Sequence, residues 1–171
     1  ERALYNTLLS GIAQDGKSFF YVNPLEVWPD NCIERTSKEH IKPVRQKWFG
    51  VACCPPNIAR TLASMGQYIY FTDKNTVYVN LYISNEAQID LDEGTTKIQI
   101  ESDLTNTGHI VLKVTPDEGS TNNLAIRIPD YVKAYTIRKD GALLEHQDIC
   151  QAYLTIGGIS KQTEIVIDFE V

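Results

Sequence analysis

The sequence feature that most constrains the fold is an alternation of apolar and polar positions that begins near residue 77. In the first run, Val77, Val79 and Leu81 alternate with Tyr78 and Asn80. Such an alternation puts every second side chain on one face of a β-strand. Similar runs recur at residues 89–91, 98–100, 110–114, 124–128 and 165–169.

Turn signals separate these runs. They are Asp73-Lys74-Asn75, Glu93-Gly94, Glu118-Gly119-Ser120 and Asp140-Gly141. Short strands without crossover helices between them predict a mainly β fold, an antiparallel, jelly-roll-like β-sandwich over residues 71–171. A closed barrel is the alternative. The side chains predicted to face inward are Val79, Leu81, Ile98, Leu112, Ile126 and Ile167.

Before residue 70 the apolar spacing is helical instead. Leu4, Leu8 and Ile12 share one helical face, which predicts a helix over residues 1–15 that ends at Asp15-Gly16. Residues 30–47 are polar and basic, and we interpret them as a surface loop. A second helix is predicted over residues 55–67. Its apolar side carries Ile58, Leu62, Met65 and Ile69.

Two helices of this length cannot bury a core of their own, so they must pack either on the sandwich or on a part of the protein outside this sequence. We therefore place a domain boundary between residues 1–70 and 71–171. The chain opens at Glu1 in helical register and without an initiator Met. We interpret this as a start inside a domain of a longer protein; the alternative is a mature N-terminus left by processing, although processing sites seldom lie inside an amphipathic helix. Exposed helix faces on such a piece favour self-association as a homo-oligomer.

Charge and composition exclude several classes of protein. The 171 residues carry 16 basic and 22 acidic side chains, a net charge of −6, which disfavours binding to nucleic acid or an anionic membrane. No apolar run reaches the roughly eighteen residues of a membrane span. An apolar content of 43% excludes a disordered chain.

The four cysteines, Cys32, Cys53, Cys54 and Cys150, do not form a disulfide framework of the secreted type. Two of them are adjacent, and a bridge between neighbours would be strained. This usage favours a reducing compartment and a cytoplasmic location. Secretion or a periplasmic location, with bridges that use Cys32 and Cys150, stays open.

One segment has the character of a reactive site: Cys53-Cys54-Pro55-Pro56-Asn57. Proline favours the first position of a helix, which predicts Cys54 at or near the N-cap and Cys53 just outside it. The partial positive charge of a helix N-terminus stabilises a thiolate, so either cysteine could be a nucleophile or a metal ligand. The alternative is that both are small apolar residues packed under the start of the helix.

Two thiolates fall short of the four ligands of a closed zinc site. None of the other candidate ligands has ligand-like spacing to Cys53, so either the site holds no metal or its remaining ligands lie elsewhere. Those other candidates are His40, His109, His146, Cys32 and Cys150.

Other candidate residues have simpler interpretations. An aromatic set could line a sugar site or pack in a core: Phe19, Phe20, Tyr21, Trp28, Trp48 and Phe49. Among the acidic residues no pair stands out as an acid/base couple. Glu86, Asp90, Asp92 and Glu93 are interpreted as a solvated strand and turn.

The chain resembles glycoside hydrolase family 127, whose characterised members are β-L-arabinofuranosidases. The resemblance rests on the motif Cys53-Cys54-Pro55-Pro56-Asn57 with its flanks, and on longer runs that extend it over most of the chain. These runs are residues 1–7, 15–25, 48–60, 77–83 and 124–129.

The resemblance implies a parent with an α/α-barrel catalytic domain followed by β-sandwich domains. Residues 1–70 would be the end of that barrel. In the family the first cysteine of the pair is the nucleophile and a zinc ligand, and the second is a further ligand; these correspond to Cys53 and Cys54. Glu1 and Tyr21 match positions expected to contact the sugar. Some relatives carry a third cysteine at the position of Val51, which removes no expected ligand.

The implied function is that of a retaining glycoside hydrolase that releases L-arabinofuranose from β-linked arabinosides, with an arabinose-containing oligosaccharide as substrate. The remaining zinc ligands, a Glu and a Cys, and the acid/base Glu would all precede Glu1. We therefore expect zinc in the intact parent, little or no zinc on this chain alone, and no turnover by it. The alternative is a non-catalytic sandwich module for carbohydrate binding or interdomain packing, which would not need the cysteine motif.

Overall fold

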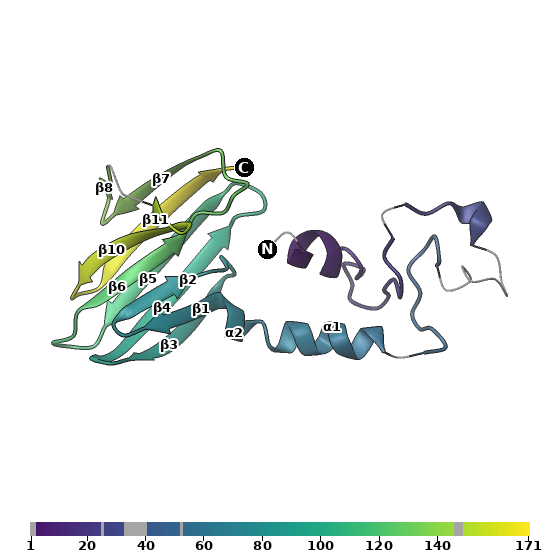
Figure 1. Cartoon of the computed structure of the whole chain (residues 1–171), viewed down its shortest axis with the longest axis horizontal. Helices are drawn as coiled ribbons and strands as arrows, with labels where there is room; N and C mark the ends of the chain where they lie inside the picture. The colour runs from purple at the N-terminus through teal and green to yellow at the C-terminus, as the bar shows by residue number, and fades with distance from the viewer. Residues whose placement is uncertain (1–2, 25, 33–40, 52, 146–148) are drawn as a thin grey trace. The chain divides into compact units, whose positions relative to one another are not determined.

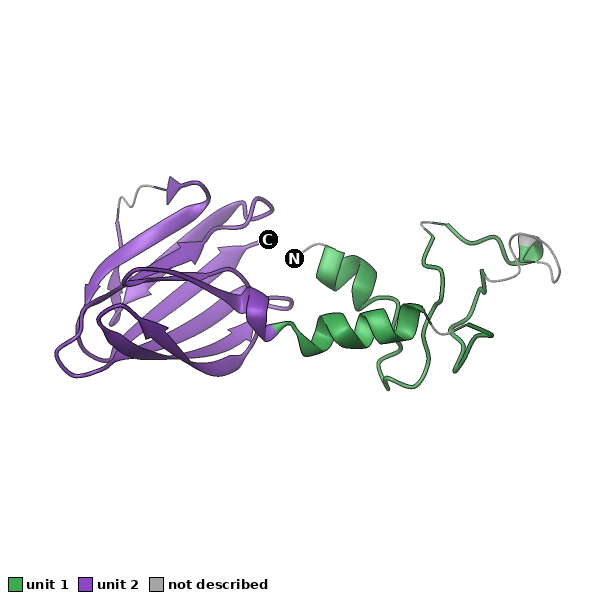
Figure 2. Cartoon of the chain, turned by 60° about the horizontal axis from the view of Figure 1, so that its bottom comes forward, with its two compact units in different colours: residues 1–65 green, residues 66–171 purple. Residues whose placement is uncertain are grey.

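The computed structural model describes residues 3–24, 26–32, 41–51, 53–145 and 149–171. The chain divides into two compact units, Glu1–Met65 and Gly66–Val171, which are coloured separately in Figure 2. Glu1, His40 and His146 lie outside the described residues. In the described part of the chain, no helix has both the length and the hydropathy needed to cross a membrane.

The second unit is a β-sandwich (Figure 1). It begins with the short helix α2 (Gly66–Ile69). The strands that follow are β1 (Tyr70–Asp73), β2 (Thr76–Val79), β3 (Asn85–Leu91), β4 (Gly94–Asp103), β5 (His109–Pro116), β6 (Asn122–Arg127), β7 (Ala134–Lys139), β8 (Ala142–Leu143), β9 (Ile149–Cys150), β10 (Tyr153–Ile159) and β11 (Thr163–Glu170). In the described residues they form two sheets, of order β1-β2-β6-β10-β9 and β3-β4-β5-β11-β7-β8.

The core of the sandwich confirms the alternation in the sequence. All six side chains predicted to face inward are buried. Along β11, for example, Ile165, Ile167 and Phe169 are buried, whereas the residues between them are only partly covered. The mainly β sandwich is therefore confirmed.

One pairing departs from the predicted antiparallel pattern, because β2 and β6 run parallel, with Val77 opposite Leu124. Parallel neighbours need a long connection. Here β3, β4 and β5, which belong to the other sheet, provide it. The chain thus crosses the sandwich and returns in the same direction.

The first alternating run is shorter than predicted, because β2 ends at Val79 rather than continuing to residue 83. Asn80 nevertheless stays buried; its backbone N–H donates to the carbonyl of Ile69 at 2.8 Å, and its side-chain oxygen accepts from the Tyr153 hydroxyl. The Tyr82 hydroxyl donates to the Arg127 carbonyl. Tertiary hydrogen bonds replace the strand ladder in this segment.

In the first unit, the predicted helix over residues 1–15 is wrong in its extent. The structure has a single π-helical segment, Leu4–Leu8. The chain then turns back, with Ile12 bridged to Phe19. Asp15-Gly16 forms the turn between them, where Gly16 has a φ of +68°. The signal taken as a helix end is therefore the tip of a hairpin-like turn.

The second predicted helix is divided. Helix α1 (Cys54–Ala63) ends in a turn at Ser64 and Met65, and α2 begins at Gly66. The predicted surface loop contains some regular structure: a short 3-10 helix, Pro29–Asn31, overlaps its start, and Gln46 near its end forms a bridge to Phe19. Residues 33–40 of that loop are outside the described part.

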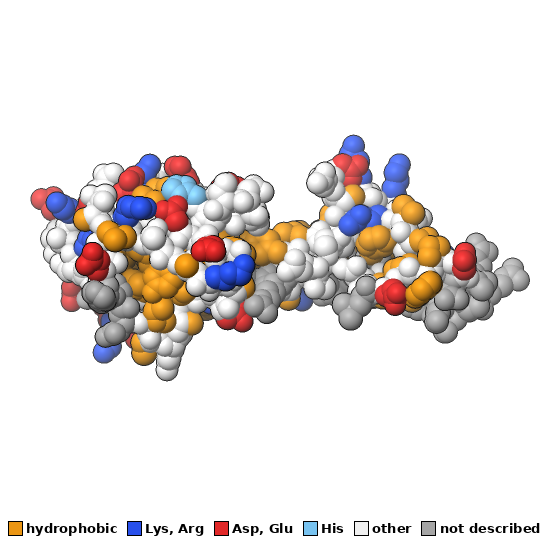
Figure 3. Space-filling view, turned by 90° about the horizontal axis from the view of Figure 1, so that it is seen from above, with side chains coloured by type: hydrophobic (Ala, Val, Ile, Leu, Met, Phe, Trp, Pro, Cys, Tyr) orange, Lys and Arg blue, Asp and Glu red, His pale blue; other side chains and the backbone are white. Residues whose placement is uncertain are grey.

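The first unit has almost no interior. Among its described residues only Gly11 is buried, and every residue of α1 retains some exposure. Several large apolar side chains are mostly exposed: Trp28, Val44, Trp48 and Val51. Apolar atoms accordingly show at the surface of this unit in Figure 3.

Candidate active site at the cysteine pair

The beginning of α1 fixes the backbone of the cysteine pair. Cys54 is the first helical residue, next to the N-cap as predicted, and Cys53 is the N-cap itself rather than just outside it. Pro55 comes second, where its missing N–H costs no helical hydrogen bond. The Asn57 side-chain amide donates to the Cys53 carbonyl at 2.8 Å, and Arg60 donates to the Asn57 side-chain oxygen at 3.1 Å. This chain of bonds holds the Cys53 peptide in place.

The two sulfur atoms lie side by side. Cys53 Sγ is 3.8 Å from Cys54 Sγ, and the Tyr21 hydroxyl oxygen is 2.6 Å from Cys53 Sγ. Cys53 is exposed and Cys54 is half-buried. The structure thus brings together three of the residues singled out in the sequence, although 32 positions separate Tyr21 from Cys53.

A small aromatic cluster supports the Tyr21 ring. The Phe49 ring centre lies 5.5 Å from that of Tyr21 and 5.3 Å from that of Phe19, both in tilted geometry. Tilted aromatic pairs at these distances attract each other. The Phe19 backbone is in turn paired with Gln46 by two hydrogen bonds of 3.0 Å.

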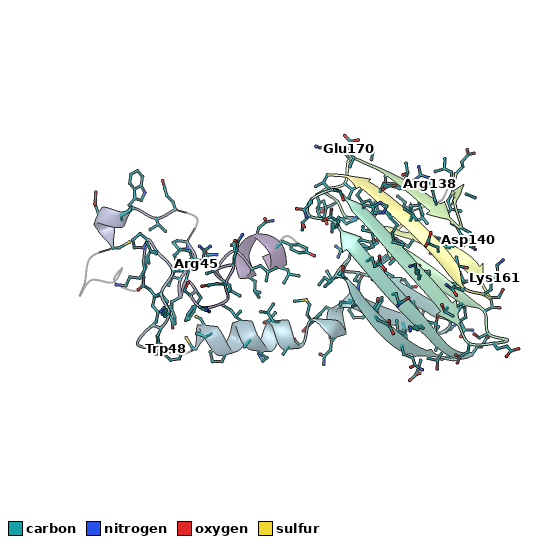
Figure 4. The ribbon with its side chains drawn as sticks, turned by 180° about the vertical axis from the view of Figure 1, so that it is seen from behind. Arg45, Trp48, Arg138, Asp140, Lys161 and Glu170 are labelled. Atoms are coloured by element: carbon teal, nitrogen blue, oxygen red, sulfur yellow. The ribbon has the colours of Figure 1, made fainter. Side chains whose placement is uncertain are left out.

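The other members of the aromatic set are not part of this cluster. The Arg45 guanidinium lies 4.7 Å above the centre of the Phe20 ring and also donates to the Ser10 carbonyl at 2.5 Å. Trp28 and Trp48 have exposed fractions of 62% and 64%. Arg45 and Trp48 are labelled in Figure 4, where both belong to the segment that leads into α1.

The two thiols differ in acidity because their surroundings differ. The hydrogen bond from Tyr21 lowers the pKa of Cys53, with Cys54 contributing in the same direction. Loss of solvent around the sulfur raises the pKa of Cys54, and so does the neighbouring Cys53. The bond with Cys53 raises the pKa of Tyr21 to about 12, so Tyr21 stays protonated as a donor. Cys53 is therefore the thiol of the pair that ionises first and the better candidate for a nucleophile.

The sulfur spacing also suits a metal ion. Two thiolates about 2.3 Å from a tetrahedral zinc ion would lie about 3.8 Å apart, and the two sulfur atoms here are separated by 3.8 Å. Cys53 and Cys54 therefore fit two positions of such a site. In the part of the chain that the structure describes, no group of three or more His, Cys, Asp or Glu side chains could hold a metal ion.

The remaining candidate residues lie away from the pair in sequence and take other roles. Cys32 and Cys150, like the pair itself, are free thiols. His109 is on the sandwich, where its Nδ1 lies 2.7 Å from Asp168. Glu86 forms an ion pair with Lys97 at 2.7 Å, as expected for a solvated strand.

Two contacts that build the site are not evident from the sequence. Asn57 belongs to the motif, but its bond to the Cys53 carbonyl appears only in the structure. The spacing of four residues on a helix is the signal that points to it. Phe49 belongs to the aromatic set, but its contact with Tyr21 has no signal in the local pattern.

The family of the chain follows from its match to two family models. Residues 1–67 match the catalytic domain, and residues 76–170 the middle domain, of the GH127 β-L-arabinofuranosidases. The chain belongs to glycoside hydrolase family 127. The resemblance predicted from the cysteine motif is confirmed.

Known GH127 proteins are similar over most of this chain. The non-reducing end β-L-arabinofuranosidase of Bifidobacterium longum is 35% identical over an alignment of 148 residues that covers 82% of this chain. Ara127N, a GH127 β-L-arabinofuranosidase from Geobacillus stearothermophilus T6, has a crystal structure that covers 99% of this chain with a TM-score of 0.85 and 41% identity. The GH127 β-arabinofuranosidase BT3674 covers 99% with a TM-score of 0.82 and 32% identity.

These relatives are much longer than the chain described here. The chain spans 22% of the Bifidobacterium protein and 27% of each of the two solved chains.

Proposed function

We propose that this GH127 chain is part of a retaining glycoside hydrolase that releases L-arabinofuranose from β-linked arabinosides. Its substrate would be an arabinose-containing oligosaccharide. The observation that carries the proposal is the exposed Cys53 thiol at the start of α1, in contact with the Tyr21 hydroxyl, in a chain whose relatives are named β-L-arabinofuranosidases.

In the proposed reaction the Cys53 thiolate attacks the anomeric carbon. A C–S bond forms while the glycosidic C–O bond breaks, and the departing oxygen takes a proton from an acid outside this chain. Water then attacks the same carbon and gives a proton to the conjugate base of that acid, while the electron pair of the C–S bond returns to sulfur. Two displacements retain the anomeric configuration, as in glycosidases that use a carboxylate nucleophile.

Cys53 and Cys54 are the residues that would hold zinc, and their sulfur spacing supports this assignment. Zinc bound there would draw charge from the Cys53 sulfur, keeping it deprotonated and making it a better leaving group in the second displacement. Within this chain, the Asn57 amide holds the Cys53 backbone as the sulfur forms and releases its bond.

Residues 1–70 are, in this proposal, the end of an α/α-barrel catalytic domain that other parts of the parent complete. Support comes from the exposed apolar side chains of the first unit and from the match of residues 1–67 to the catalytic-domain model. The upstream ligands and the acid/base Glu would come from the rest of the barrel. The four free thiols support a cytoplasmic location.

Replacement of the nucleophile in the intact protein tests this function. Cys53→Ser should abolish turnover of a chromogenic β-L-arabinofuranoside with the fold retained, because a hydroxyl is a poorer nucleophile than a thiolate. Cys150→Ser, which changes a free and exposed cysteine on β9, is the matched control and should keep full turnover. Full activity of Cys53→Ser would refute the assignment, and an inactive but folded parent would favour the non-catalytic module.

A further inference from the structure

We propose that Tyr21 is a positioning residue for the nucleophile: its hydroxyl fixes the direction of the Cys53 sulfur. This inference rests on the proposed function, since it assumes that Cys53 attacks the sugar. It differs from a direct sugar contact of Tyr21, because Tyr21 acts here through the sulfur.

The first argument is the contact itself. The Tyr21 hydroxyl lies within hydrogen-bond distance of Cys53 Sγ, at 2.6 Å. A thiolate has no proton of its own, so the phenol must be the donor. The bond uses one lone pair of the sulfur and thereby restricts the rotation of the Cys53 side chain.

The second argument is that the Tyr21 ring is itself held. The Phe49 ring packs against Tyr21 at 5.5 Å and against Phe19 at 5.3 Å. Backbone bonds between Phe19 and Gln46 in both directions fix the base of this cluster. The Tyr21 hydroxyl therefore has a fixed position relative to the Cys53 sulfur, because neighbouring side chains restrict the motion of the Tyr21 ring.

The third argument is that Cys53 is anchored from the other side. The Asn57 amide binds its carbonyl at 2.8 Å, and Arg60 orients Asn57. With the backbone held by α1, rotation about the Cα–Cβ bond is the main remaining freedom of the sulfur. Tyr21 removes that freedom. The Tyr21 proton stays on its oxygen throughout, and no bond of Tyr21 breaks.

Tyr21→Phe in the intact, zinc-loaded enzyme is the direct test, because it keeps the ring and removes only the hydroxyl. We expect kcat to fall by about 10–100-fold, which is typical when a hydrogen-bond partner of a metal ligand is removed. KM should stay unchanged. Tyr68→Phe, an exposed tyrosine on α2, is the matched control and should leave both constants unchanged. Phe49→Leu, which loosens the ring without touching the hydroxyl, should lower kcat to a smaller extent.

A spectroscopic readout separates positioning from activity. In the cobalt(II)-substituted enzyme, loss of the hydrogen bond should move the sulfur-to-metal charge-transfer band to longer wavelength, because the sulfur lone pairs rise in energy. Tyr68→Phe should leave the band in place.

Two outcomes would overturn the inference: an unchanged kcat in Tyr21→Phe, whether or not KM rises, or an unmoved cobalt band. If Tyr21→Phe does not fold, an unchanged kcat in Phe49→Leu would also overturn the inference. Cys53→Ser separates a failure of the proposed function from a failure of the role of Tyr21. Turnover by that variant would refute the proposed function, whereas an inactive Cys53→Ser beside a fully active Tyr21→Phe would refute only the role of Tyr21.

Discussion

Replacement of Gly108 by alanine adds one methyl group where the backbone before β5 packs closely against β11, and so tests this contact of the sandwich. Gly108 precedes β5, and its carbonyl accepts a hydrogen bond from the Phe169 N–H at 3.0 Å. Its φ is +76°, in the region that side chains rarely adopt. A Cβ at this position would lie 2.1 Å from the Phe169 carbonyl oxygen, a backbone atom of β11.

Gly119 provides the matched control. It has a similar φ of +82°, but an added Cβ would meet no atom within 4 Å. Left-handed backbone costs an L-residue about 1–2 kcal/mol, and this cost applies to both positions. Forcing extra atoms into filled space adds about 1–3 kcal/mol, and this applies to Gly108 alone.

We therefore expect Gly108→Ala to destabilise the sandwich by about 2–5 kcal/mol, and Gly119→Ala by about 1–2 kcal/mol. Urea unfolding followed by circular dichroism measures both, with the change in free energy taken from the midpoint and slope. Equal losses of stability in the two variants would refute the close approach of Gly108 to β11.

Four further predictions follow from the core, the surface and the cysteine pair. Ile167→Ala, at a fully buried position on β11, should lower the free energy of unfolding by about 2–5 kcal/mol. Val166→Ala, on the other face of the strand, should lower the free energy of unfolding by less when measured in the same urea titration. The hydrogen bond from His109 and the neighbouring Arg138 hold the pKa of Asp168 below its ordinary value. The ionised Asp168 carboxylate therefore stabilises the fold above about pH 3.9, and this stabilisation is lost as the pH falls through the lowered pKa. Asp168→Asn should accordingly lower the melting temperature at pH 7 by more than it does at pH 2. Cys54→Ser in the intact enzyme should lower zinc content, by elemental analysis, together with turnover. The chain alone should neither retain stoichiometric zinc nor turn over a chromogenic arabinofuranoside, because the complete ligand shell carries most of the affinity.

The strands that the sequence predicts are those whose alternation is strong. Ile98 and Ile100 on β4 or Ile165 and Ile167 on β11 stand out because one face is fully buried. Strand β10 is not predicted from the sequence, because Gly157-Gly158 interrupts its alternation of apolar and polar side chains. Its pairing with β6 also shifts register between Ile156 and Ile159. The parallel pairing of β2 with β6 depends on a connection through the other sheet, which no local pattern encodes.

In the candidate site, too, local sequence patterns predict some features, whereas others depend on contacts between segments far apart in the chain. The sequence motif predicts the position of Cys53 and Cys54 at a helix start, to within one residue. The bond between Tyr21 and Cys53 joins segments 32 positions apart, and their approach is set by the bridge of Phe19 to Gln46. A local pattern therefore predicts where the two thiols lie. The Tyr21 hydroxyl, which makes the pKa values of Cys53 and Cys54 differ, reaches the pair only through the tertiary structure.

The most direct test of Cys53 as the nucleophile is to locate the covalent sugar. The intact enzyme would be mixed with an activated β-L-arabinofuranoside, quenched in acid during turnover, and digested for peptide mass spectrometry. Fragment spectra across Cys53-Cys54 would assign the modified sulfur. We predict one pentosyl group on Cys53, absent from the Cys53→Ser variant. A pentosyl group on Cys54 or on a carboxylate would contradict the proposed mechanism.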